Sequence, residues 1–362
     1  MGMRNRLRVA WSLCLFAVTF VPASASADRD GLSYVPAYGV HSWPFTLGQG
    51  HLRTYAHNHL RYFRIVFGMH PSLSYAAGLP ASEQEQFDLL VWNIVRSNST
   101  VLPTLVSEGP PAASALAQWQ QFCTALARRY GPHGAFWSSH RSLPYRPIRA
   151  WEIWNEPNSP AFFSPVSTDA YRLVLEYARA GLRAGDPNAR IVLGGINWNS
   201  EGIDAPAFLR AVIESGGRSL FDAVAVHPYS ESAEGAAERV RAIHRVLEDH
   251  HLGQVQIWIT EIGWAVGPSR WRYTVANEHQ QAQLLEQFVA LMDQKRDEWN
   301  IGPIIWFNDH DVPGLVGVGW IEHCGLRRSD HLMRPTRARD AWRSIGRIAR
   351  ERRRVHLPIV RE

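Results

Sequence analysis

Two glutamates each follow a short β-rich run, and carboxylates placed in this way can do acid and base chemistry. Glu156 stands within residues 151–158, where Pro157 ends the run directly after the carboxylate. Glu261 stands near the end of the run within residues 257–264. Cleavage of a glycosidic bond needs such a pair, because one carboxyl group must protonate the leaving oxygen while an ionised one stabilises or attacks the anomeric carbon. Two neighbouring carboxylates also resist ionising together, which raises the pKa of one of them.

The elements that must position these residues form a regular alternation. Short runs rich in β-branched and aromatic residues alternate with longer segments of helical period, a pattern typical of parallel βαβ units. The expected strands span 34–40, 62–67, 100–106, 148–154, 190–193, 223–227, 256–260 and 303–307. No Gly-rich phosphate turn of an open doubly wound sheet is present. Eight strands therefore favour an α/β fold that closes as a single eightfold β/α (TIM) barrel.

In a closed barrel, residues just after the strands collect at one rim, so Glu156 and Glu261 are expected to face each other across it. Glu152 has the same strand parity as Glu156 but lies deeper, and we interpret it as a buried structural acid paired with an arginine. Between strands, Ser82 followed by Glu85 predicts a capping box at the start of a helix.

Three motifs carry a resemblance to a known group of enzymes. They are Asn-Glu-Pro at 155–157, Val-His-Pro-Tyr at 226–229 and Thr-Glu-Ile-Gly-Trp at 260–264. In this order they resemble clan A of the glycoside hydrolases, most like family 39, with families 5 and 51 close behind. The resemblance implies that Glu156 is the general acid/base and Glu261 the nucleophile of a retaining mechanism that needs no cofactor and no metal.

The resemblance also implies a set of substrate-binding residues. Asn155 matches the residue that binds the sugar 2-hydroxyl, and Arg64 resembles the arginine that keeps the nucleophile ionised. Trp306 matches an aromatic platform for the apolar face of the sugar. The remaining expected substrate-binding positions are His41, His227 and Tyr229.

Composition and the first residues set the cellular context. The 362 residues are 46% hydrophobic and 20% charged, as in an ordinary globular chain. Arginines, an apolar run and an Ala-Ser-Ala site indicate a signal peptide at 1–27, followed by one catalytic domain at 28–362. We expect a secreted or periplasmic monomer that acts on a polysaccharide or oligosaccharide. The leader holds three arginines and no acid, so its removal lowers the net charge from +5 to +2, which gives no indication of nucleic acid or a membrane as partner.

Two other interpretations remain open. A metal-dependent barrel hydrolase would use His57, His59 and Asp309, although the two histidines precede the second strand and fit a helix surface. A carbohydrate-binding barrel without turnover is the other alternative. Cys123 lies on an apolar stripe, which favours a buried free thiol, while a bridge to Cys324 is neither required nor excluded.

Overall fold

The computed structural model describes residues 38–42, 55, 60–198, 201–268, 270, 272–314, 319–329 and 335–355. The expected signal peptide at 1–27 and the histidines at 57 and 59 lie outside the described residues. Within the described part, every helix is too short or too polar to serve as a membrane span.

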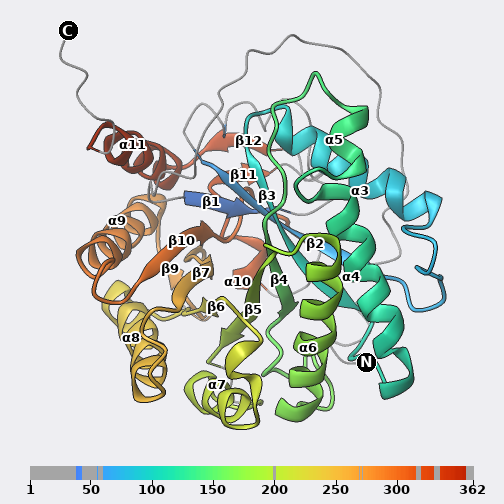
Figure 1. The fold of residues 1–362 in the computed structure, drawn as a ribbon. Helices are drawn as coiled ribbons and strands as arrows, with labels where there is room; N and C mark the ends of the chain where they lie inside the picture. Colours follow the sequence, from blue (N-terminus) through green and yellow to red (C-terminus); the bar gives the residue numbers. More distant parts are fainter. Residues whose placement is uncertain are drawn as a thin grey trace, which may run out of the picture.

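Eight parallel strands close into a barrel, which confirms the expected α/β fold (Figure 1). Around the barrel the order is β1-β10-β7-β6-β5-β4-β3-β2, so the first and last barrel strands of the chain are neighbours. The strands are β1 (Tyr38–His41), β2 (Tyr62–Met69), β3 (Thr100–Ser107), β4 (Ala150–Asn155), β5 (Arg190–Asn197), β6 (Ala223–His227), β7 (Gln256–Ile262) and β10 (Ile301–Trp306).

Helices surround the barrel and bury one face against it (Figure 1). They are α3 (Ala81–Val95), α4 (Leu116–Tyr130), α5 (Ala135–Ser139), α6 (Thr168–Gly185), α7 (Ala205–Glu214), α8 (Ala233–Asp249), α9 (Glu278–Gln294) and α11 (Asp340–Val355). Side-chain oxygens of Ser167, Ser232 and Asn277 cap α6, α8 and α9 by accepting backbone N–H bonds.

The predicted capping box at α3 is wrong. The helix begins two residues earlier than a Ser82 cap requires, so Pro80 is the N-cap and makes no side-chain cap bond. Ser82 lies inside the first turn, where its hydroxyl cannot fill the capping position.

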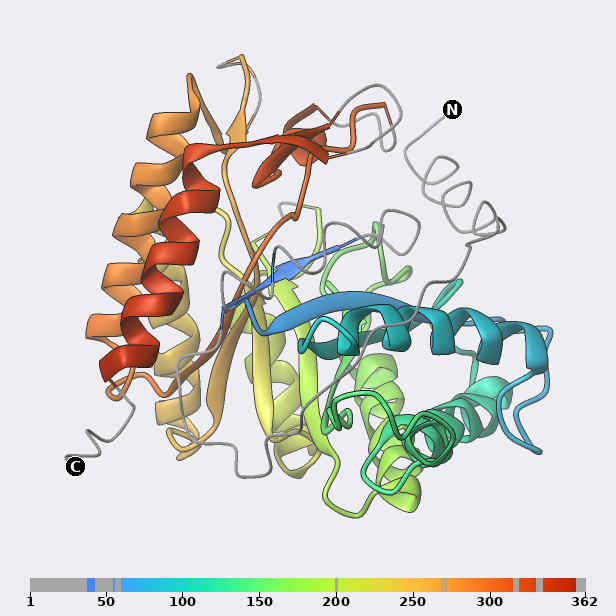
Figure 2. The ribbon, with the colours of Figure 1, turned by 90° about the horizontal axis from the view of Figure 1, so that it is seen from above.

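Small additions follow two of the barrel strands. β8 (Ala265–Val266) pairs with β9 (Thr274–Val275) after β7, and β11 (Arg327–Ser329) pairs with β12 (Pro335–Ala338) after β10. The short helix α10 (Gly319–Glu322) precedes β11. All of them extend the end of the barrel at which β7 and β10 finish (Figure 2).

The barrel interior is layered, because residues two apart on a strand point to the same side. One layer is apolar and includes Leu102, Val192, Ala225 and Trp258, packed with the partly buried Tyr62 and Ala150. Two residues further along five of these strands, the inward positions are Arg64, Thr104, Glu152, His227 and Thr260, all 0% exposed. A polar layer therefore lies directly on the apolar one, towards the C-terminal ends of the strands.

Candidate active site

The polar layer is centred on the ion pair of Arg64 and Glu152. Arg64 donates Nε–H to one carboxylate oxygen at 2.6 Å and Nη2–H to the other at 3.1 Å. The backbone N–H of Gly195 and the hydroxyls of Thr104 and Thr260 donate to the same carboxylate. Glu152 is thus a buried, arginine-paired acid, as its strand parity predicted.

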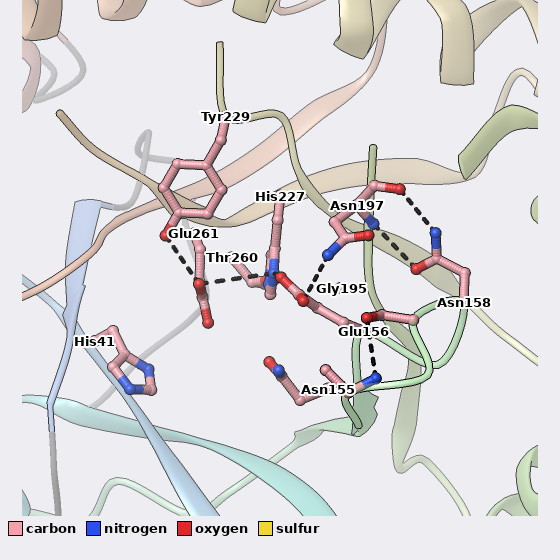
Figure 3. Close-up of polar contacts among 12 residues, drawn as sticks. His41, Asn155, Glu156, Asn158, Gly195, Asn197, His227, Tyr229, Thr260 and Glu261 are labelled. Atoms are coloured by element: carbon pink, nitrogen blue, oxygen red, sulfur yellow. Dashed lines mark hydrogen bonds and ion pairs between the residues drawn. The ribbon is translucent and has the colours of Figure 1, made fainter. Parts of the chain in front are cut away.

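Glu261 shares the same arginine. Arg64 donates Nη1–H to Glu261 Oε1 at 2.6 Å. The Tyr229 hydroxyl donates to Glu261 Oε2 at 2.9 Å (Figure 3). Burial raises the pKa of Glu261, while Arg64 and the Tyr229 hydroxyl act against that rise by favouring the carboxylate. The Tyr229 ring is itself held by an aromatic cluster, stacked on Tyr273 at 5.6 Å and edge-on to Trp320 at 5.1 Å.

Glu156 has a different environment. Its Oε1 lies 2.8 Å from His227 Nδ1, and its Oε2 accepts from the Asn197 amide at 2.5 Å (Figure 3). Burial raises the pKa of Glu156 well above its ordinary value, and the negative charge of Glu261 adds to the rise. No arginine bonds to Glu156 among the described contacts, so this carboxyl group is the one that keeps a proton.

The two carboxyl groups meet across the barrel mouth. One oxygen of each, together with a ring nitrogen of His227, lies within 4.8 Å of the others. The Glu156 and Glu261 side chains remain 12% and 10% exposed, which leaves each a surface that a ligand can reach. Glu156 has a φ of +46°, a left-handed backbone conformation that is uncommon for a residue with a side chain.

Asn155 and His41 border the pair. The Asn155 side-chain oxygen accepts from Arg64 at 2.8 Å, which fixes the orientation of the amide and leaves its NH₂ group to donate to a ligand. His41 Nδ1 lies 3.2 Å from Arg64 Nη1. Burial lowers the pKa of His41 well below its ordinary value, and Arg64 lowers it further. The structure therefore brings together seven of the eight expected site residues.

Trp306 is the exception, and its predicted role as an exposed platform is wrong. Its side chain is 1% exposed, donates to the Cys324 carbonyl oxygen at 2.9 Å and packs 6.1 Å from the Trp264 ring. Because strand neighbours point to opposite faces, the aromatic ring on the site side belongs to the next residue. The Phe307 ring stacks on His41 at 5.1 Å and lies 6.3 Å from Tyr229.

Sequence reasoning missed Asn197 and Asn158. Asn158 donates to the Asn197 carbonyl oxygen at 2.7 Å and accepts from its N–H at 3.1 Å, which fixes the residue that bonds Glu156 (Figure 3). The fifth strand was expected to end at residue 193, because Gly194 and Gly195 have low β propensity. The strand continues to Asn197, and a register shift between residues 193 and 196 pairs Asn197 with His227, which simple alternation from the inward Val192 does not predict.

The groups that could bind a metal already have protein partners. Glu156, His227 and Glu261 offer clustered ligand atoms, but the Arg64 guanidinium bonds directly to Glu261 and opposes a cation there. Asp309 of the metal-dependent alternative is 2% exposed and accepts from the Ser42 hydroxyl at 2.9 Å. The two cysteines left open by the sequence, Cys123 and Cys324, are both free and buried.

Comparison with known proteins agrees with this geometry. The family model described as a glycosyl hydrolase catalytic core matches residues 148–316, which include Glu156 and Glu261. Residues 148–316, just under half of the chain, are thus similar to a glycosyl hydrolase catalytic core. This match supports a glycosidase. No protein of curated function matches the sequence.

Solved structures share the fold of the chain. A family 39 glycoside hydrolase from Bacteroides cellulosilyticus WH2 superimposes with a TM-score of 0.62 at 16% identity, over 87% of this chain and 64% of its own. A monomeric β-xylosidase from Caulobacter crescentus CB15 gives 0.63 at 18% identity, over 87% and 68%. A family 39 enzyme from Xanthomonas axonopodis pv. citri gives 0.62 at 17% identity, over 87% and 66%. The chain thus spans about two thirds of the length of these proteins, and slightly less for the first.

Proposed function

We propose that the chain is a retaining glycosidase that cleaves O-glycosidic bonds in an oligosaccharide or polysaccharide by double displacement. The observation that carries the proposal is the approach of the two carboxyl groups, with one oxygen of each within 4.8 Å. Retaining enzymes hold their carboxyl groups about 5–5.5 Å apart, whereas inverting enzymes need about 6.5–9.5 Å to place a water between them.

The environments of the two groups assign the first step. Glu261 is bonded to Arg64 and Tyr229, which favour its ionised form, so it attacks the anomeric carbon. Glu156, whose raised pKa keeps it protonated, transfers its proton to the leaving oxygen as the glycosidic bond breaks. The products of this step are the released alcohol and a glycosyl ester on Glu261.

The second step reverses the role of Glu156. Once Glu261 is esterified its charge is gone, so the carboxylate that helped to raise the pKa of Glu156 no longer does so. Glu156 can then remove a proton from a water that attacks the anomeric carbon, which releases the sugar and restores both carboxyl groups. Two inversions give net retention.

The stereochemistry of the first product is a direct test. Proton NMR during hydrolysis of aryl glycosides and of xylan, glucan and mannan should show that the anomer released first has the configuration of the substrate. Release of the opposite anomer would contradict the double displacement. Binding of these sugars without any released reducing end would instead favour a carbohydrate-binding barrel, and loss of turnover on chelation would favour a metal-dependent hydrolase.

Substitution of each carboxyl group separates the two roles. Glu261→Gln should remove turnover on every substrate, because no nucleophile remains. Glu156→Gln should lower kcat/KM about 10²–10⁴-fold on substrates with a poor leaving group. It should affect the first step far less on a dinitrophenyl glycoside, whose leaving group needs no proton. Circular dichroism spectra like that of the wild type would show that the fold is intact, and equal losses on both substrates would refute the assignment of Glu156.

The signal peptide expected at 1–27 supports action outside the cytoplasm, in the periplasm or medium. Mass spectrometry of the mature protein tests this part of the proposal, with an N-terminus near Asp28 as the expected result. Detection of the intact leader on a cytoplasmic protein would contradict it.

A further inference from the structure

A chain of hydrogen bonds runs beneath Glu156 through two fully buried side chains. His227 contacts Glu156 Oε1 through Nδ1 at 2.8 Å and Thr260 Oγ1 through Nε2 at 3.1 Å. Thr260 Oγ1 in turn lies 2.9 Å from Glu152 Oε1. The chain therefore links the acid/base residue to the deepest carboxylate of the polar layer.

The direction of the chain is set at Glu152. Five donors surround this carboxylate: Nε and Nη2 of Arg64, the Thr104 hydroxyl, the Gly195 N–H and the Thr260 hydroxyl. A carboxylate paired with the Arg64 guanidinium accepts hydrogen bonds and donates none, so its contact of 2.9 Å with Thr260 Oγ1 is a hydrogen bond only if the hydroxyl donates. The hydrogen of the Thr260 hydroxyl must therefore point to Glu152.

This direction determines the tautomer of His227. Because its one hydrogen goes to Glu152, Thr260 Oγ1 can offer His227 only a lone pair, and Nε2 must carry the ring proton. Burial, with Arg64 and His41 nearby, lowers the pKa of His227 well below its ordinary value, so the ring is neutral. Its Nδ1 is then an acceptor. The contact of 2.8 Å with Glu156 Oε1 is a hydrogen bond only if Glu156 is the donor.

We propose that Thr260 is a positioning residue for the acid/base: by fixing the Nε2–H tautomer of His227, it keeps the proton of Glu156 on Oε1 in the resting enzyme. The proposal rests on the proposed function, in which Glu156 must start the cycle protonated. The other oxygen of Glu156 accepts from Asn197, which leaves Oε1 as the atom that holds the proton.

The other groups facing His227 are compatible with this assignment. Glu261 Oε2 lies 3.7 Å from His227 Nδ1 but already accepts from Tyr229. The Arg64 guanidinium acts on the ring as a positive neighbour and disfavours the imidazolium. The ring packs over the backbone of Gly195, where an added Cβ would overlap it. The ring position is thus set by packing, and the proton position by Thr260.

Loss of the Thr260 hydroxyl should change the preferred tautomer. Without an acceptor at Nε2, His227 can carry its proton on Nδ1 and donate it to the Glu156 carboxylate. A hydrogen bond to the ionised form lowers the pKa of a carboxyl group. The alkaline limb of the activity profile, which follows the loss of the Glu156 proton, should therefore move to lower pH.

The kinetic experiment compares Thr260→Val with two matched variants. Valine keeps the β-branched shape, Thr260→Ser restores the hydroxyl, and Thr104→Val removes another hydroxyl bond to the same carboxylate on the side away from His227. On a substrate with a poor leaving group, Thr260→Val should shift the alkaline limb of kcat/KM down by about one pH unit, equivalent to about 1.4 kcal/mol. Thr260→Ser and Thr104→Val should keep the wild-type limb. An equal shift in Thr104→Val, or none in Thr260→Val, would overturn the proposal.

The second experiment does not depend on turnover. Nitrogen NMR of wild-type protein labelled with ¹⁵N-histidine, with the His227 signals assigned by their loss in His227→Gln, should show a protonated Nε2 and an unprotonated Nδ1. The reverse assignment would overturn the proposal even if the enzyme is active or Thr260→Val fails to fold. If no glycoside is hydrolysed but the NMR result is as expected, the proposed function fails while the tautomer assignment stands.

Discussion

Glu156 and Glu261 are the same residue type, but their neighbouring groups give their carboxyl groups different pKa values. Both are buried, and burial raises the pKa of each. Glu261 is bonded to a guanidinium and a phenol, whereas Glu156 is bonded to a neutral imidazole and an amide. Arg64 bonds directly to Glu261 and acts on Glu156 only through its charge, so the pKa of Glu156 is raised further than that of Glu261 and the pair holds one proton between them.

This asymmetry predicts a bell-shaped pH dependence of kcat/KM. The active form has Glu261 ionised and Glu156 protonated, so activity rises as pH increases through the lower pKa of the pair and falls through the higher one. Because both pKa values are raised from 4.5, both limbs should lie above pH 4.5, with the alkaline limb further from it. Initial rates on an aryl glycoside across the pH range test this, and Glu156→Gln, which cannot ionise, is the control that should lose the alkaline limb. A single limb in the wild type would contradict the assignment.

At the scale of the element, β5 shapes the site because its residue 195 is a glycine, which has no side chain. The His227 ring occupies the space where a Cβ of residue 195 would lie, while the Gly195 N–H and carbonyl oxygen bond to Glu152 and to the Glu156 N–H. This glycine therefore allows strand β6 to place its histidine directly against the neighbouring strand.

Gly195→Ala should displace the His227 ring and break its bond to Glu156. We expect a loss of stability of about 1–3 kcal/mol from overpacking and a clear fall in kcat. Gly253→Ala is the matched control, since its Cβ would meet only the side chain of Glu248 at an ordinary distance of 3.9 Å. Urea unfolding and initial rates measure both effects, and wild-type behaviour of Gly195→Ala would show that the ring position is not needed.

The sequence pattern predicted the positions of the strands better than the residues at which the strands end. All eight barrel strands form where expected, because β-branched runs between helical segments have few other ways to bury themselves. The ends depend on contacts that a local pattern does not contain. Two glycines made β5 look shorter in the sequence than it is. At β10, an error of one residue assigned Trp306 to the site instead of Phe307. The sequence predicted that both glutamates lie at the rim of the barrel. It did not predict that the Asn197 amide bonds to Glu156.

At the scale of the molecule, one buried arginine ties the last helix to the barrel. Arg339 precedes α11, forms an ion pair with Asp311 at 2.5 Å and donates to the carbonyl oxygens of His323 and Gly325 at 2.9 Å. It joins the segment after β10 to the chain that enters α11, which packs against α9 beside the barrel (Figure 1).

Arg339→Met should destabilise the protein by about 3–5 kcal/mol, because it leaves the Asp311 carboxylate buried without its cation. Arg343→Met should change stability by no more than about 0.5 kcal/mol, since that side chain is 76% exposed and its pair with Asp340 is screened by water. Urea denaturation at neutral pH compares the two variants with the wild type. Similar free energies of unfolding for the two variants would mean that the Arg339 contacts do not hold the two segments together.

The position of Arg64 between two carboxylates bears on the whole reaction cycle. In the proposed double displacement, Glu261 becomes an uncharged ester half-way through. If Glu261 were the only anionic partner of Arg64, the guanidinium would then be an isolated cation in the barrel interior. Glu152 takes no part in bond exchange and stays beside Arg64 throughout. In the proposed intermediate, the Arg64–Glu152 pair therefore stays balanced, and no uncompensated cation forms beneath the ester.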